Sequence, residues 1–124
     1  HGELAWDGNS CLYIINNIGS ENVRIIFDPA HLFRFGLNPI IEGEKMREYI
    51  LSIQFKDFFI GEGDRHRYVL LGQGEVPNEE FTEFIRRTKF DGFIVDEYEK
   101  WWHPELPDPM QGLRHDLNYL KISF

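Results

Sequence analysis

Side chains with carboxylate or amide oxygens lie at or near the ends of three apolar segments. Such oxygens could support acid–base chemistry or bind a metal ion. Asp28 ends the segment 23–28, Gln54 lies in the segment 49–55, and Glu97 ends the segment 92–97. Carboxylate and amide oxygens are hard ligands that suit Mg²⁺ or Mn²⁺. Acids that converge on one point repel one another unless a cation neutralises them. If the segments are neighbouring parallel strands, their ends predict a shared cation site.

Each of these residues also has a purely structural interpretation. Asp28 could form a turn or cap a helix, and Glu97 could be a solvated loop acid among other charged residues. Lys56 and Asp57 could form a surface ion pair worth less than about 1 kcal/mol. Gln54 is the most informative, because a buried amide without partners in an apolar strand costs roughly 1–3 kcal/mol.

The order of the predicted elements indicates a parallel sheet. Apolar residues at helical spacing predict helices over 9–18, 38–48 and 77–88 and after Asp108, and β-rich runs predict strands over 23–28, 49–55 and 92–97. Strands that alternate with helices form right-handed crossovers in a parallel sheet. Doubly wound and barrel architectures both fit this pattern. A full (β/α)8 barrel needs around 250 residues, so the chain would supply about half of one.

Composition excludes several classes of protein. The chain has 124 residues and a formal net charge of −8, which argues against a nucleic-acid partner. The longest apolar runs are far shorter than the roughly 18 residues that a membrane span needs. Cys11 is the only cysteine, which fits a reducing compartment such as the cytoplasm. The chain starts with His1 rather than Met, so the start could be a cut end.

Several motifs resemble the xylose-isomerase-like TIM barrel family of sugar isomerases and epimerases. They are the FDPAH strand end at 27–31, SIQFKD at 52–57, LGQGEV at 71–76, FDGFIVDEYE at 90–99 and WHPELPDP at 102–109. The segment at 1–5 is similar to the residues that follow the fifth strand. The motifs occur in the family's order over nearly the whole chain.

The resemblance implies a fold and a domain organisation. It implies an α/β chain that forms the parallel-stranded half of a (β/α)8 TIM barrel, from the tail of strand five through helix eight. Residues 1–124 would then form a single domain, the carboxyl-terminal half of the barrel. The open edges of a half barrel could join two copies into a homo-oligomer.

The resemblance also implies roles for single residues. Asp28 and Glu97 match two metal-ligand positions, and Gln54 stands where most members have a ligating histidine. His31 matches a residue that contacts substrate oxygens. The remaining expected substrate-binding residues are Arg65, Arg67 and His1. An amide oxygen suits Mn²⁺ or Mg²⁺ better than Zn²⁺, so the harder ions are expected.

The expected reaction is isomerisation or epimerisation of a small sugar, a sugar phosphate or a hydroxy-keto acid. Glu97 would transfer the proton next to the carbonyl, with the metal holding the substrate oxygens. The family's second glutamate would precede His1, so the 124-residue chain alone should be nearly inactive. A non-catalytic or regulatory barrel is an alternative, and an endonuclease-IV-like nuclease is another that the negative charge disfavours. No membrane partner is expected.

Overall fold

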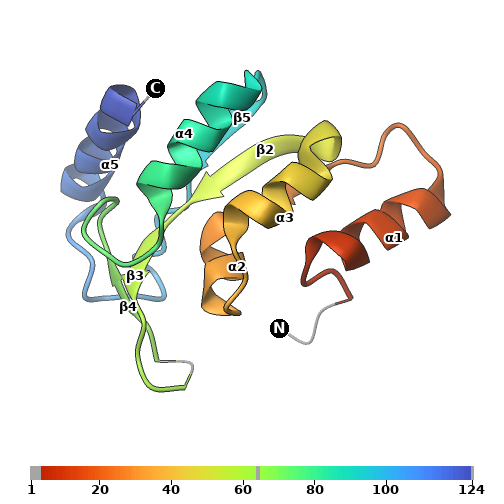
Figure 1. The fold of residues 1–124 in the computed structure, drawn as a ribbon. Helices are drawn as coiled ribbons and strands as arrows, with labels where there is room; N and C mark the ends of the chain where they lie inside the picture. Colours follow the sequence, from red (N-terminus) through yellow and green to blue (C-terminus); the bar gives the residue numbers. More distant parts are fainter. Residues whose placement is uncertain (1–3, 64, 124) are drawn as a thin grey trace.

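The computed structural model describes residues 4–63 and 65–123 (Figure 1). In chain order the elements are α1 (Gly8–Ile18), β1 (Ile25–Phe27), α2 (Pro29–Arg34), α3 (Pro39–Met46), η1 (Arg47–Tyr49), β2 (Ile50–Phe55), β3 (Asp57–Phe59), β4 (Arg67–Val69), α4 (Asn78–Thr88), β5 (Phe93–Asp96) and α5 (Pro109–Ser123). None of the helices in this part of the chain is long and apolar enough to cross a membrane.

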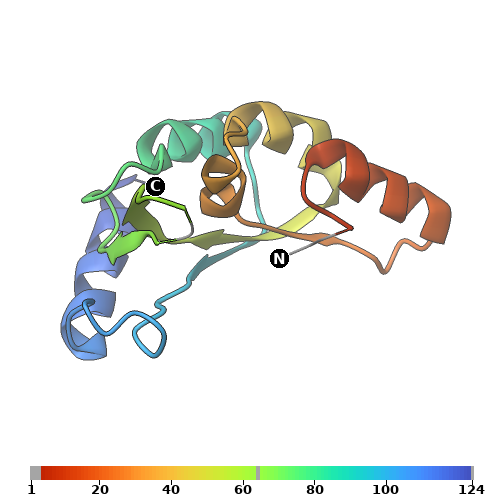
Figure 2. The same ribbon diagram turned by 90° about the horizontal axis from the view of Figure 1, so that it is seen from below.

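A parallel sheet in the order β1-β2-β5 forms the centre of the fold. Phe27 pairs with Ile53, and Gln54 pairs with Val95. Figure 2 shows α1 to α4 lying against one face of this sheet, while the opposite face is bare. The sequence prediction of an α/β fold with a parallel sheet is confirmed.

Side chains alternate between the two faces of the strands. Phe27, Ile53 and Phe55 point to the helix-covered face and are buried, and Phe27 stacks on Phe81 of α4 with ring centroids 5.2 Å apart. On the bare face, Ile26 is 65% exposed and Phe93 is 70% exposed. The main apolar core therefore lies between the sheet and its helices, and a second buried cluster includes Phe58 of β3 and Tyr68 of β4.

One helix and one two-stranded hairpin were not predicted from the sequence. Asp28 does not extend the first strand. It caps α2, as its structural interpretation allowed, and its Oδ1 accepts a hydrogen bond from the backbone N–H of His31 at 2.9 Å. Pro29 follows at the first helical position, where its missing N–H is harmless. The second element is an antiparallel hairpin of β3 and β4, which extends from the end of β2.

Lys56 and Asp57 do not form the surface ion pair that their adjacency suggested. Both side chains are buried, and they have different partners. The Asp57 carboxylate accepts backbone hydrogen bonds from Phe58 (2.9 Å), Gly72 (3.0 Å), Gly74 (2.9 Å) and Val76 (3.2 Å). A Cβ on Gly74 would overlap this carboxylate, so only glycine allows the close approach. Asp57 thus holds the loop over 72–76 against the end of β2.

We predict that Asp57→Ala lowers the free energy of unfolding by about 2–4 kcal/mol, because it leaves buried N–H groups without an acceptor. Urea denaturation followed by circular dichroism would measure the change. Asp91→Ala, at an exposed loop position, is the control and should change stability by less than about 0.5 kcal/mol. Equal losses for the two variants would contradict the anchoring role of Asp57.

Candidate functional site

The ammonium group of Lys56 lies at the carboxyl ends of the three parallel strands and joins their acids. Its Nζ is 3.0 Å from Oδ2 of Asp28, 2.6 Å from Oε2 of Glu97 and 2.7 Å from Oε1 of Glu99. The Lys56 side chain is only 3% exposed. The nearby carboxylates raise the pKa of Lys56 despite the opposing effect of burial, so the amine stays charged.

Strand geometry explains why these groups meet. The parallel ladder continues past β5, since the N–H of Glu97 donates to the carbonyl of Phe55 at 2.9 Å. This hydrogen bond brings the residue after β5 beside the residue after β2. Asp28 follows β1 at the same edge of the sheet. The ends of three neighbouring strands therefore contribute one cation and two acids, and Glu99 adds a third acid from the following loop.

Asp28 also positions His31. One carboxylate oxygen caps the helix that carries the imidazole, and the other lies 3.7 Å from Nδ1 of His31. Nε2 of His31 is 3.3 Å from Nζ of Lys56. The imidazole is therefore held beside the acids at the carboxyl edge of the sheet.

A second histidine extends the charged cluster towards the loop after β5. Nε2 of His103 lies 3.3 Å from Oε2 of Glu99, and its Nδ1 lies 3.5 Å from Oε1 of Glu105. The ring of His103 stacks on the buried ring of Tyr68 with centroids 3.6 Å apart. This stacking fixes one wall of the site.

A cavity of about 400 Å³ opens next to this cluster. Beyond Lys56, Glu97 and Glu99, it is lined by His31, Arg34, Tyr68, Trp102 and His103. Glu97 keeps 35% of its side chain exposed, in contrast to Lys56. The cavity is large enough for a small polar molecule, and it offers acids, imidazoles and an aromatic face.

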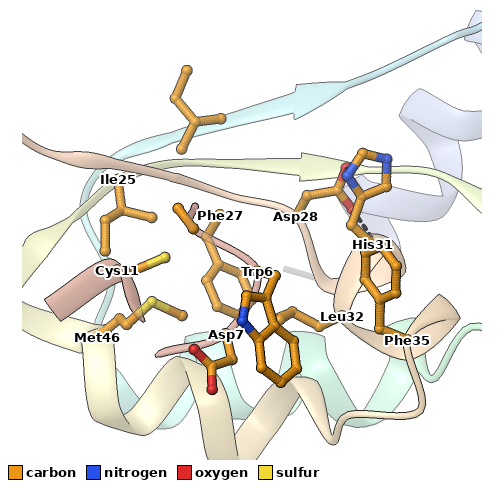
Figure 3. A pocket seen from close by; sticks show the side chains of 12 residues that line it. Trp6, Asp7, Cys11, Ile25, Phe27, Asp28, His31, Leu32, Phe35 and Met46 are labelled. Carbon is orange, nitrogen blue, oxygen red and sulfur yellow. Dashed lines mark hydrogen bonds and ion pairs between the residues drawn. The ribbon is translucent and has the colours of Figure 1, made fainter. Parts of the chain in front are cut away.

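A second cavity of about 240 Å³ lies beside β1 and is mainly apolar. Figure 3 shows Asp28 and His31 at one end of it and Cys11 and Met46 at the other. Burial raises the pKa of the Cys11 thiol, which keeps it in the neutral form. This cavity therefore borders the charged cluster through its wall at Asp28 and His31.

The other residues predicted from the sequence lie in different surroundings. Gln54 is on the bare face of the sheet, opposite Val95 and two residues before Lys56. Arg67 lies on β4, with its guanidinium 4.5 Å from the centre of the Phe59 ring. Neither Arg65 nor Arg67 lines the 400 Å³ cavity. His1 lies outside the described residues.

The carboxylates of Asp28 and Glu97 converge, as the predicted metal site requires. The Lys56 ammonium lies between them. Within residues 4–63 and 65–123, no group of three or more His, Cys, Asp or Glu side chains is arranged to hold a metal ion. The Lys56 ammonium therefore takes the place that a divalent ion between Asp28 and Glu97 would need.

Two further acids lie on the helix-covered side of the sheet, and the sequence did not point to them. Asp116 of α5 is buried and accepts a hydrogen bond from the N–H of Leu71 at 2.9 Å. Oδ2 of Asp96 is buried and has no hydrogen-bond partner within the described chain. Burial, with a contribution from Asp116, raises the pKa of Asp96 to about 7. In the folded chain Asp96 therefore favours its protonated form only below a pH of about 7.

The parallel sheet, its helix-covered face and the acids at its carboxyl edge define an α/β chain organised as part of a barrel. A family profile described as "Xylose isomerase-like TIM barrel" matches residues 2–122. The chain therefore belongs to the xylose isomerase-like TIM barrel family. The sequence has no significant match among curated proteins.

Solved structures agree with this assignment. A xylose isomerase domain protein from Planctomyces limnophilus is 26% identical with a TM-score of 0.74, and the alignment covers 94% of this chain and 41% of that one. A probable 3-DHS dehydratase of petrobactin synthesis from Bacillus anthracis is 20% identical with a TM-score of 0.77, over 95% and 45% of the two chains. An L-ribulose 3-epimerase is 16% identical with a TM-score of 0.75, over 95% and 41%. The chain spans less than half the length of these proteins.

We predict that Asp96→Asn reduces the pH dependence of stability. In the unfolded chain this carboxyl ionises near its ordinary pKa of 3.8, whereas in the folded chain it ionises near a pKa of about 7. The wild-type chain should therefore lose stability as the pH rises from about 4 to about 7. Asparagine cannot ionise, so the variant should lose less.

Urea denaturation at pH 5 and pH 8 would test this expectation. Asp91→Asn, at an exposed position, is the control and should follow the wild type. Asp96→Asn could instead lose as much stability between the two pH values as the wild type. That result would show that folding does not raise the pKa of Asp96.

Proposed function

We propose that this chain carries the proton-transferring acid of an isomerase or epimerase that acts next to a carbonyl group. The substrate would be a small sugar, a sugar phosphate or a hydroxy-keto acid. The observation that carries the proposal is the placement of Glu97, which lines a 400 Å³ cavity while Lys56 holds its carboxylate at 2.6 Å. Family membership and similarity to an epimerase fold support the same reaction class.

In the proposed mechanism, the Glu97 carboxylate removes a proton from the carbon next to the carbonyl. The electron pair of the broken C–H bond moves into an enediolate, and negative charge develops on the carbonyl oxygen. Transfer of the hydroxyl proton between the two enediolate oxygens, with return of the proton from Glu97 to the former carbonyl carbon, gives an isomer. Protonation of the original carbon by an acid on the opposite face gives an epimer. Glu97 performs the first step, because its side chain is anchored yet still reaches the cavity.

Neighbouring residues would orient the substrate. His31 lines the same cavity and is held by Asp28, so it is placed to contact substrate oxygens. Lys56 fixes the direction of the Glu97 carboxylate relative to the substrate. Arg65, Arg67 and His1 remain predicted substrate-binding residues. Binding of Mn²⁺ or Mg²⁺ by Asp28, Gln54 and Glu97 also stays a prediction, and it requires the Lys56 ammonium to leave its place between Asp28 and Glu97.

Dehydration of a hydroxy-keto acid is a second candidate, because one similar structure is a probable 3-DHS dehydratase. Its first step is the same removal of a proton next to a carbonyl. The two candidates differ in the fate of the enediolate, which is either reprotonated or loses a hydroxyl group as water. A product with one water less would identify the dehydratase.

The assembly of the protein also remains a prediction. Each outer strand of the sheet, β1 and β5, pairs on one side only within the described chain. The bare sheet face carries exposed apolar side chains such as Ile26 and Phe93. Such edges and faces could be covered by the rest of a barrel or by a second copy of the chain. We propose a cytoplasmic location on the basis of the single cysteine.

We predict that Glu97→Gln lowers kcat/KM at least about 100-fold, because glutamine cannot accept the proton. The assay is exchange of the substrate's carbon-bound hydrogen with deuterated water, measured by NMR on the whole protein. This readout detects the first step of both candidate reactions. Glu83→Gln, at an exposed position of α4, is the control, and an unchanged exchange rate in Glu97→Gln would eliminate the mechanism.

We predict that Trp102→Ala raises KM several-fold with a smaller effect on kcat. Trp102 lines the cavity, and its 74% exposed ring offers an apolar face to the C–H groups of a sugar. Trp101→Ala is a matched control, because Trp101 is 85% exposed and does not line the cavity. Equal effects of the two substitutions on KM would contradict a substrate contact at Trp102.

A further inference from the structure

Acidic groups surround the ammonium of Lys56 on several sides. An ammonium has three N–H donors and no acceptor. Three carboxylates lie within 3.0 Å of Nζ, and Nε2 of His31 lies 3.3 Å away. These carboxylates belong to Asp28, Glu97 and Glu99 and reach Nζ from different elements of the chain. The Lys56 side chain is only 3% exposed, so these acids form most of the surroundings of its ammonium group.

The backbone that carries Lys56 is held on both sides. The carbonyl oxygen of Lys56 accepts a hydrogen bond from Nδ2 of Asn78 at 3.2 Å, and Asn78 is itself buried. The next residue, Asp57, is anchored by four backbone N–H groups. The ammonium can therefore leave the acids only by rotation of its own side chain into the cavity.

A divalent ion and this ammonium would need the same space. Mg²⁺ binds carboxylate oxygens at roughly 2.0–2.1 Å, and an ion that close to both Asp28 and Glu97 would overlap Nζ of Lys56. Either cation can neutralise the acids, whereas both together cannot be accommodated. The acids left without any cation would repel one another in a mostly buried place.

We infer that Lys56 is the built-in cation of this site, and that a divalent metal ion competes with its ammonium group for Asp28, Glu97 and Glu99. The inference goes beyond the proposed reaction, because it concerns the cation alone and holds whether or not Glu97 transfers a proton. It explains why three acids lie together at the strand ends.

Titration with Mn²⁺, followed by electron paramagnetic resonance of the free ion, tests the inference on the full chain. We expect Lys56→Met to bind one Mn²⁺ at least tenfold more tightly than the wild type. Lys45→Met is the matched control, because Lys45 also pairs with a buried acid, Glu42, at 2.7 Å. This control should bind Mn²⁺ as weakly as the wild type.

A second substitution locates the bound ion. Adding Asp28→Asn to Lys56→Met should abolish the gained affinity. Tight Mn²⁺ binding by the wild type that Asp28→Asn removes would overturn the inference, because the ammonium would then be no competitor. An unchanged affinity in a folded Lys56→Met chain would also overturn it.

Loss of the ammonium could prevent folding, so the folded state is measured too. Thermal unfolding of Lys56→Met with and without Mn²⁺, followed by circular dichroism, supplies this readout. A variant that folds, or melts at a higher temperature, only when Mn²⁺ is added supports the exchange of one cation for the other. A variant that stays unfolded at saturating Mn²⁺ contradicts it, and the wild-type titration remains decisive in either case.

Discussion

The electrostatic balance around one buried ammonium group determines how the carboxyl edge of this sheet is organised. Lys56 is almost inaccessible to water and lies within 3.0 Å of three carboxylates. Breaking a buried charge cluster by removing one partner is strongly destabilising, by about 3–5 kcal/mol in measured cases. The directions of Asp28 and Glu97 therefore depend on the position of Lys56. The orientation of His31 depends in turn on Asp28.

Asp57 supplies the rigid support behind this cluster. Its side chain points away from the Lys56 acids and binds the loop over 72–76 through backbone N–H groups. Adjacent residues of a strand point to opposite faces of the sheet. Lys56 therefore points to the charged site. Asp57 points to the other face, where it binds the loop over 72–76. The pair explains why a charged dipeptide is buried at the end of an apolar strand.

Much of the fold follows from the sequence, because hydrophobic periodicity and helix caps are local signals. The strand over 50–55 and the helices over 8–18 and 78–88 lie where their apolar patterns predict them. The helix α2 was missed because Asp28-Pro29 was interpreted as a strand end, although Asp followed by Pro is also a helix-start signal. The hairpin was missed because β3 begins a single residue after β2, whereas the predicted strand ended at residue 55 and no strand was predicted beyond it.

The site was only partly predictable. Strand ends pointed to Asp28 and Glu97, since the ends of parallel strands share one edge. Lys56 was assigned to a surface pair, although strict alternation along the strand would have placed it on the same face as Gln54. The contribution of Glu99 depends on the loop after β5, and that of Asp96 depends on burial beside α5. Neither the loop conformation nor the packing has a local sequence signal.

The most direct test of the charged cluster is NMR of the lysine ammonium groups in the folded chain at neutral pH. An ammonium enclosed by three carboxylates exchanges its protons slowly with water, whereas exposed lysines exchange too fast to be observed. We expect one protected ammonium signal that is absent from Lys56→Met. A spectrum without any protected ammonium signal would contradict the central position of Lys56.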